Sequence, residues 1–109
     1  MHMKVHYHVS LSTTSTATGE GLLQDLSAEG CRIECECARP LPVNTYLSLR
    51  LLISPTEPPI LVDLAAVRWV REKECGVHFL SVQPPQAKRL KKFLASAAPL
   101  NNPLEPDNR

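Results

Sequence analysis

Three residues that could do chemistry, Asp25, Ser27 and Gly30, stand at the spacing D-x-S-x-x-G between two apolar runs. A carboxylate accepts hydrogen bonds, a hydroxyl donates and accepts them, and a glycine lets the backbone come close to another group. Asp and Ser side chains also bond nearby backbone N–H groups and thereby hold turns. The segment therefore predicts either a stabilised turn or the polar edge of a ligand site.

The four cysteines could also bind a metal, which is a different kind of chemistry. Cys31, Cys35 and Cys37 alternate along one stretch of sequence, and Cys75 comes much later. Zinc sites usually need four converging ligands, but strand residues four apart are roughly 13 Å apart. Only Cys35 and Cys37 could chelate together, with Cys75 as a third ligand. Because free cysteine packs as a small hydrophobe, we expect reduced thiols in a core and no metal ligands.

Two further groups of polar residues have a structural and a functional interpretation. His6 and His8 form an H-x-H pair that could bind a metal or simply face solvent. The basic residues within 88–92 form either a solvated helix face or a contact for an acidic partner. The sequence has no G-x-S-x-G motif, no phosphate-binding loop and no evident acid pair. It therefore predicts that the protein is not an enzyme and has no cofactor.

Length and composition indicate one soluble globular domain. The chain has 109 residues, of which 43% are hydrophobic and 21% charged, with a formal net charge of +1. This near-neutral balance does not favour binding of a nucleic acid polymer. No apolar run approaches the roughly 18–20 residues of a membrane helix, and the first residues contain no apolar signal segment. We therefore expect a cytoplasmic protein that does not enter the membrane.

The elements that would position these side chains follow from the period of the apolar residues. Apolar and polar residues alternate as in half-buried strands. Residues 18–21, with two glycines, predict a hairpin turn. In the fifth segment the polar residues Asp63 and Arg68 are five apart, so strict alternation would place them on opposite faces. A β-bulge near Ala65 and Ala66 would place both on the same face and is therefore predicted. The expected strands cover residues 5–11, 22–26, 31–37, 46–53, 60–70 and 75–82.

After the last strand the apolar period changes to that of a helix. Residues 86–98 carry an apolar stripe at helical spacing, with two prolines ahead of it and Pro99 behind it. Residues 99–109 have few apolar anchors and predict a flexible tail. Six strands joined by short connections favour antiparallel pairing. The sequence thus predicts a mainly β fold, a six-stranded antiparallel barrel with one C-terminal helix that covers an opening or an edge.

The sequence resembles the PilZ domain family in three parts. These are DLSAEGCRIE, then VRWVREKECGVHFLSV with Trp69, Gly76 and Phe79, then the amphipathic helix. The resemblance covers residues 4–98. It implies a PilZ-like six-stranded β-barrel that acts as a receptor module for the bacterial second messenger cyclic di-GMP. The family normally carries two ligand motifs, R-x-x-x-R near the N-terminus and [D/N]-x-S-x-x-G.

The resemblance assigns ligand-binding roles to five positions of this chain. Asp25, Ser27 and Gly30 match the second motif, whereas the first is degenerate, with Lys4 and His8 at the arginine positions. Arginine offers a planar fork that grips guanine edges or phosphate, but lysine is a point charge and histidine is mostly neutral at neutral pH. A good bidentate pair is worth about 1–3 kcal/mol, so weakened affinity is expected.

Three more side chains complete the predicted site. Arg32 and Arg68 could supply cations to phosphate, and Trp69 could supply a flat apolar wall. The leading hypothesis is a receptor whose segment 4–8 is ordered by cyclic di-GMP and changes contacts with a protein partner in bacterial signalling. The alternative is a degenerate domain that binds no nucleotide and acts as an interaction module in motility, pilus or envelope-polymer regulation. A metal-dependent regulator acting through the cysteines is a third hypothesis.

Overall fold

Six strands and one helix make up the computed structural model, which describes residues 3–13, 18–35 and 41–97. Each element lies close to the segment expected for it from the sequence. The predicted tail at residues 99–109 lies outside the described residues. The elements are β1 (Met3–Thr13), β2 (Thr18–Leu26), β3 (Gly30–Cys35), β4 (Tyr46–Leu52), β5 (Ile60–Arg71), β6 (Glu74–Ser81) and α1 (Pro84–Ala97).

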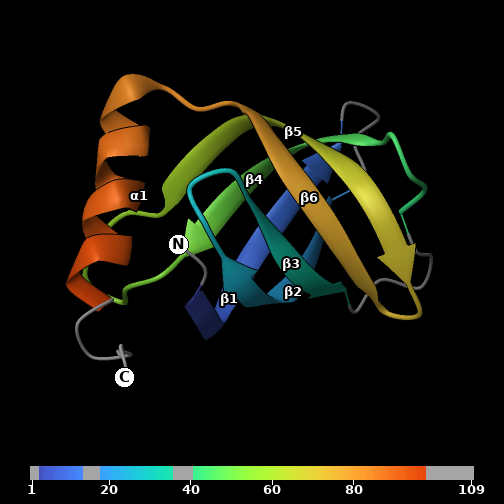
Figure 1. Ribbon diagram of the computed structural model, residues 1–109, viewed down its shortest axis with the longest axis horizontal. Coiled ribbons are helices and arrows are strands. Elements are labelled where there is room, and N and C mark those ends of the chain that lie inside the picture. The colour runs from blue at the N-terminus through green and yellow to red at the C-terminus, as the bar shows by residue number, and fades with distance from the viewer. Residues whose placement is uncertain (1–2, 14–17, 36–40, 98–109) are drawn as a thin grey trace, which may run out of the picture.

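The strands form a closed barrel in the order β1-β2-β3-β6-β5-β4 (Figure 1). Every neighbouring pair is antiparallel, and β1 pairs with both β2 and β4, which closes the sheet on itself. Closure removes the unpaired edges that an open sheet would present. The predicted six-stranded antiparallel barrel with a C-terminal helix is confirmed.

The barrel interior is filled by the inward-facing residues of every strand. In β4 alternate residues are buried and exposed along the whole strand, as period-2 geometry requires. Cys31, Cys35 and Cys75 are buried in the same core as the aliphatic side chains. The thiols of Cys35 and Cys75 lie 3.7 Å apart. These three cysteines pack as small hydrophobes, and Cys37 lies outside the described residues.

Helix α1 lies across one end of the barrel (Figure 1). Leu90 and Leu94 are buried in the core, and the ring of Phe93 packs edge-on against Tyr7 of β1, with centroids 5.8 Å apart. The guanidinium of Arg89 donates to the backbone carbonyls of the β4–β5 connection. One cation of the predicted basic face therefore fixes the helix to that connection, and α1 covers the opening as expected.

One local prediction needs correction, and another is confirmed with an addition. Residues 18–21 belong to β2 and form no hairpin turn. A Cβ at Gly21 would lie 2.7 Å from the backbone oxygen of Glu34, so this glycine permits close approach of β3. The register of β5 shifts against β4 where Asp63 and Leu64 lie, and against β6 between Leu64 and Ala65 and again at Arg68. An irregularity is therefore present beside Ala65, as predicted, and a further one falls at Arg68.

Candidate functional site

The turn between β2 and β3 is built around the side chain of Ser27. Its hydroxyl accepts hydrogen bonds from the backbone N–H groups of Glu29 and Gly30, at 3.3 and 3.2 Å. The same oxygen lies 3.3 Å from the Gly30 carbonyl oxygen, to which it donates. The Ser27 N–H also donates to that carbonyl at 2.9 Å. Ser27 therefore holds the turn that presents its neighbours.

Gly30 allows β3 to approach β6 closely. It lies opposite His78 in the antiparallel register, and a Cβ built on it would collide with the backbone carbonyl oxygen of Val77. Beside this contact, the N–H of Phe79 on β6 donates to the carbonyl of Glu29 in the β2–β3 turn at 2.8 Å, so the turn also lies close to β6. The glycine of the motif thus serves the packing of two strands, and it also lies at the edge of a pocket described below.

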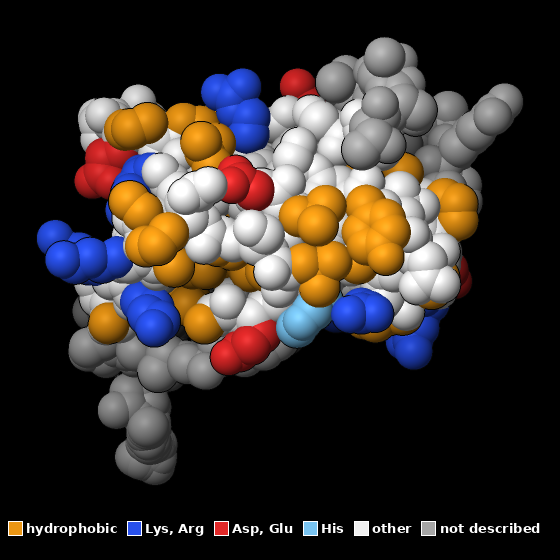
Figure 2. Space-filling model, turned by 90° about the horizontal axis from the view of Figure 1, so that it is seen from above, with side chains coloured by type: hydrophobic (Ala, Val, Ile, Leu, Met, Phe, Trp, Pro, Cys, Tyr) orange, Lys and Arg blue, Asp and Glu red, His pale blue; other side chains and the backbone are white. Residues whose placement is uncertain are grey.

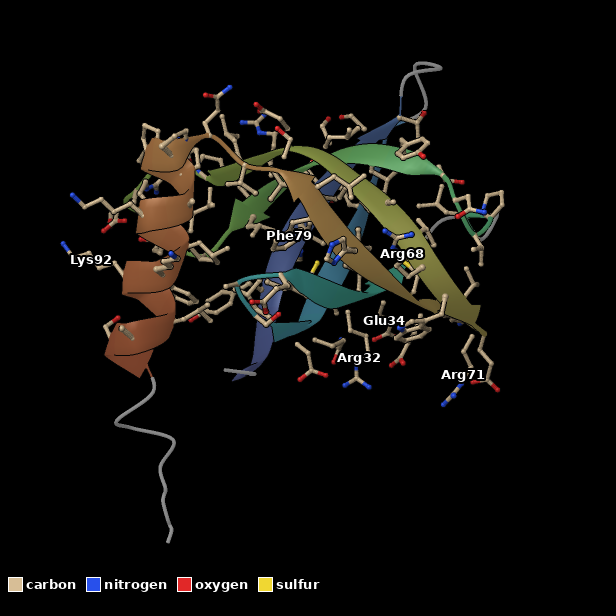
Figure 3. All side chains as sticks on the ribbon, turned by 45° about the horizontal axis from the view of Figure 1, so that its top comes forward. Arg32, Glu34, Arg68, Arg71, Phe79 and Lys92 are labelled. Atoms are coloured by element: carbon tan, nitrogen blue, oxygen red, sulfur yellow. The ribbon has the colours of Figure 1, made fainter. Side chains whose placement is uncertain are left out.

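Asp25 and Arg32 face one another across β2 and β3. They are register partners, and the Arg32 Nη2 lies 2.9 Å from the Asp25 Oδ2. The second terminal nitrogen of the guanidinium, Nη1, lies 3.7 Å from the Oε1 of Glu74 on β6. The Arg32 Nε is buried and has no hydrogen-bond partner within the described part of the chain. Figure 3 shows Arg32 and Glu34 projecting from β3 on the outer side of the barrel. Asp25 is therefore a buried carboxylate held by a half-buried cation.

The bulge in β5 turns both Arg68 and Trp69 to the outer face. Both side chains are exposed, whereas Val67 before them is buried in the core. Trp69 is the register partner of Gly76, and a Cβ on Gly76 would overlap the indole ring. The indole therefore lies flat over the glycine backbone and offers its other face to solvent. Trp69 thus presents a planar apolar surface on the outside of the barrel, and its contact with a ligand stays a prediction.

These residues lie on one transverse row that crosses five strands. Each is the register partner of the next, in the order Lys4, Asp25, Arg32, Gly76, Trp69. A hollow of about 440 Å³ opens over this row, a volume within the range of small-molecule sites. It is lined by Asp25, Ser27, Glu29, Gly30, Cys31, Arg32, Arg68, Trp69, Gly76, Val77 and His78.

The structure thus brings most of the predicted site residues together and separates one from them. Lys4 lies opposite Asp25, at the end of the row. His8 lies opposite Leu22 on one side and Leu52 on the other, with an exposed side chain outside the residues that line the hollow. The register of β1 shifts between Lys4 and Tyr7. The two positions matched to the arginine motif therefore lie on different rows of the barrel.

Two polar lining residues and one supporting residue were not found from the sequence. His78 lies two residues after Gly76, so strand alternation could have assigned it to the same face. Glu29 lies within the D-x-S-x-x-G segment itself. Glu74 contacts Arg32 only through the pairing of β3 with β6, which the sequence does not specify.

The Cys31 thiol, which lines the hollow, is poorly suited to reaction. Burial raises the pKa of the Cys31 thiol well above its usual value, and the nearby Cys35 adds to the shift. A thiol with a raised pKa stays protonated and is a weak nucleophile and metal ligand. No group of three or more His, Cys, Asp or Glu side chains within the described ranges converges as a metal site would require.

Comparison with protein families gives one match that spans most of the chain. The model of the PilZ domain matches residues 2–96. The chain therefore belongs to the PilZ domain family, a family of cyclic di-GMP receptor domains. No match to a curated protein was found.

Solved structures with the same fold include PilZ domains. The PilZ domain of CeSA from a cellulose-synthesising bacterium superposes with a TM-score of 0.71 at 12% identity, covering 88% of this chain and 96% of that one. The PilZ domain of Escherichia coli YcgR, determined with cyclic di-GMP, gives 0.74 at 16% identity, over 88% and 87%. The Bacillus subtilis inhibitor of motility MotI gives 0.78 at 11% identity, over 94% and 51%.

These structural likenesses establish the fold. At 11–16% identity they do not transfer a ligand to this chain. Across the described residues, no helix combines the length and the apolar character needed to cross a membrane.

Proposed function

We propose that this domain is a cytoplasmic receptor module that binds cyclic di-GMP in the hollow over the transverse row, with weakened affinity. The observation that supports the proposal is the convergence of Asp25, Arg32 and Trp69 on one outer row that starts at Lys4. Family membership supplies the ligand class, and the hollow supplies a place of suitable size.

Each group on the row has a chemical counterpart in the nucleotide. Cyclic di-GMP carries two guanines, whose Watson–Crick edges donate from N1 and N2, and two phosphates. The Asp25 carboxylate accepts from a guanine edge. The indole of Trp69 stacks on a base, an interaction worth about 1–3 kcal/mol in nucleic acid complexes. Arg32 and Arg68 supply guanidinium groups to phosphate oxygens.

Weakened affinity follows from what the row lacks and from how its charges are arranged. Lys4 offers a point charge in place of a guanidinium fork, and His8 lies outside the lining of the hollow. The Asp25–Arg32 ion pair must also open or share its charges when the ligand enters. Ser27 and Gly30 act indirectly, because they fix the turn that carries Asp25.

Titration calorimetry with cyclic di-GMP tests the proposal. We expect binding in the micromolar range or weaker, which corresponds to about 8 kcal/mol or less. Asp25→Ala should reduce it about tenfold, whereas Asp63→Ala, which removes an exposed carboxylate from β5, should leave it unchanged. The proposal is wrong if no heat is released at about 100 µM protein, or if Asp25→Ala binds as well as the parent.

A second candidate function is an interaction module that binds no nucleotide. It is favoured by the internal use of the motif, since Ser27 is bonded within its turn and Asp25 is paired with Arg32. In that case a protein partner would be captured equally with and without cyclic di-GMP. A yield that depends strongly on the nucleotide would count against this candidate.

A further inference from the structure

The large exposed hydrophobic side chains are concentrated on one part of the barrel. In the part of the chain that the structure describes, they all belong to β4, β5, β6 or the turn that leads into β4. Their exposed fractions range from 37% to 53%. They are Val43, Tyr46, Leu52, Leu61, Leu64, Trp69 and Leu80. We call the outer surface that carries them the apolar face.

The opposite strands have a different outer surface. The outward positions of β1 and β3 carry residues such as His8, Ser10, Arg32 and Glu34, which are exposed or partly exposed. Side chains of a barrel strand alternate between the interior and the outer surface, so every strand has outward positions. The fold itself does not require leucine at these outward positions. Their concentration on three adjacent strands is a property of this sequence.

The centre of the apolar face is continuous across the three strands. Ala66 is the register partner of Tyr46 on β4 and of His78 on β6. It is only 3% exposed, so neighbouring side chains cover it. Leu64 lies two residues before Ala66, and Leu80 lies two residues after His78, on the same outer side. Figure 2 shows hydrophobic side chains gathered beside a histidine over this region.

Exposed contiguous apolar surface of this kind marks interaction sites in soluble proteins. Helix α1 does not cover it, because Leu90 and Leu94 enter the end of the barrel. The nucleotide proposed above uses Trp69 at one margin of the face, but Tyr46, Leu64 and Leu80 are absent from the lining of the hollow.

The charges on the same strands indicate what would cover the face. Arg50, Arg68 and Arg71 are exposed, and among the described residues none of them has a carboxylate within ion-pair distance. Asp63 on β5 is also exposed, and its carboxylate accepts a hydrogen bond from the neutral Gln83 amide at 3.0 Å. Arginine and aromatic residues are enriched in protein interfaces and among their energetic centres. The face therefore combines apolar contact area with exposed arginines that outnumber the exposed carboxylates of the same strands.

We propose that the apolar face, centred on Tyr46, Leu64 and Leu80, is the docking surface for a partner protein whose contact segment is apolar and flanked by Asp or Glu. Complementary charge steers and orients such a partner. A second copy of this chain would bring like charges together, which opposes self-association. A membrane is a poorer occupant, because these side chains lie on strands and are only partly exposed, with no protruding amphipathic helix to insert.

Selection from a phage-displayed random peptide library on the purified full chain tests the proposal. The selected peptides should combine Leu, Ile, Phe or Trp with Asp or Glu. They should bind Leu80→Asp about tenfold more weakly than the parent, with circular dichroism verifying that the variant is folded. Leu64→Ser is the milder variant should Leu80→Asp unfold. Arg50→Glu should weaken binding, whereas Lys91→Glu on α1 makes the same charge change elsewhere and should have no effect.

Several results would overturn the proposal. These are peptides that bind Leu80→Asp or Leu64→Ser as well as the parent, peptides without acidic residues, or no enrichment at all. Sedimentation of the parent with phosphatidylglycerol vesicles, lost in Leu80→Asp, would assign the face to a membrane. A dimer by light scattering that Leu80→Asp dissociates would assign it to a second copy.

Discussion

The guanidinium of Arg32 lies 2.9 Å from the carboxylate of Asp25, so the acidic residue of the D-x-S-x-x-G segment is paired within the protein. The side chain of Asp25 is 12% exposed and that of Arg32 is 34% exposed. A carboxylate this buried would lose hydration at considerable cost without a charge-assisted partner. The pair therefore links β2 to β3 and sets the electrostatic state of the hollow before any ligand arrives.

Breaking this pair should destabilise the fold moderately. Arg32→Ala is expected to lower the free energy of unfolding by about 1 kcal/mol. This is less than the cost of breaking a fully buried ion pair, because the guanidinium is partly solvated. Urea unfolding of Arg32→Ala, Asp25→Asn and the double variant measures the coupling. Additive single effects would mean that the contact contributes nothing to stability.

Two glycines of the site should respond differently to the same substitution. In Gly30→Ala the new methyl group meets the backbone carbonyl of Val77, which cannot move without separating β3 from β6. We expect a loss of about 1–3 kcal/mol in unfolding free energy. In Gly76→Ala the methyl group meets the indole of Trp69, a surface side chain that can swing away.

Gly76→Ala should therefore cost less stability than Gly30→Ala but change the environment of the indole. Because the chain has one tryptophan, its fluorescence reports this change directly. The expected result is a shifted emission maximum in folded Gly76→Ala and weaker binding of cyclic di-GMP. An unchanged spectrum would mean that the ring does not cover the glycine in solution.

Much of the outer row could be predicted from the sequence. Strict alternation in β3 assigns Arg32 to the outer face, and the later Trp69 and Gly76 belong to the same family pattern. What alternation cannot supply is the order of strands in the barrel. Because β3 pairs with β6 and not with β4, Glu74 reaches Arg32 and the outer face of β6, which carries His78, borders the hollow.

The positions of Ser27 and His8 depend on local geometry that composition does not encode. Ser27 could have faced a ligand or its own backbone, and the turn geometry gives it three backbone contacts. His8 was matched by counting four residues from Lys4, but the register of β1 shifts between Lys4 and Tyr7. Parity indicated the irregularity beside Ala65 in β5 but not the further one at Arg68.

The raised pKa of Cys31 predicts a pH dependence of stability. Burial disfavours the thiolate in the folded state, whereas an unfolded cysteine titrates near about 8.5. The contribution to stability is therefore fully present below about pH 8.5 and is lost as the pH rises above it, by up to about 1.4 kcal/mol per unit. Urea unfolding between about pH 7 and 10 should show a steeper decline for the parent than for Cys31→Ala. Equal slopes would mean that Cys31 titrates normally in the folded protein.

The register of β1 predicts which missing arginine matters. Lys4 is the register partner of Asp25 at the end of the transverse row, whereas His8 pairs with Leu22 and Leu52 away from the hollow. A guanidinium at position 4 adds a fork for guanine or phosphate. We therefore expect Lys4→Arg alone to tighten cyclic di-GMP binding about five- to tenfold, and His8→Arg alone to change it by less than about twofold. Calorimetry on both single variants and the double variant measures this, with Lys91→Arg on α1 as the control for the chemical change. Equal gains from the two single variants would show that segment 4–8 leaves the strand when the nucleotide binds, and that the register of the free domain does not define the ligand contacts.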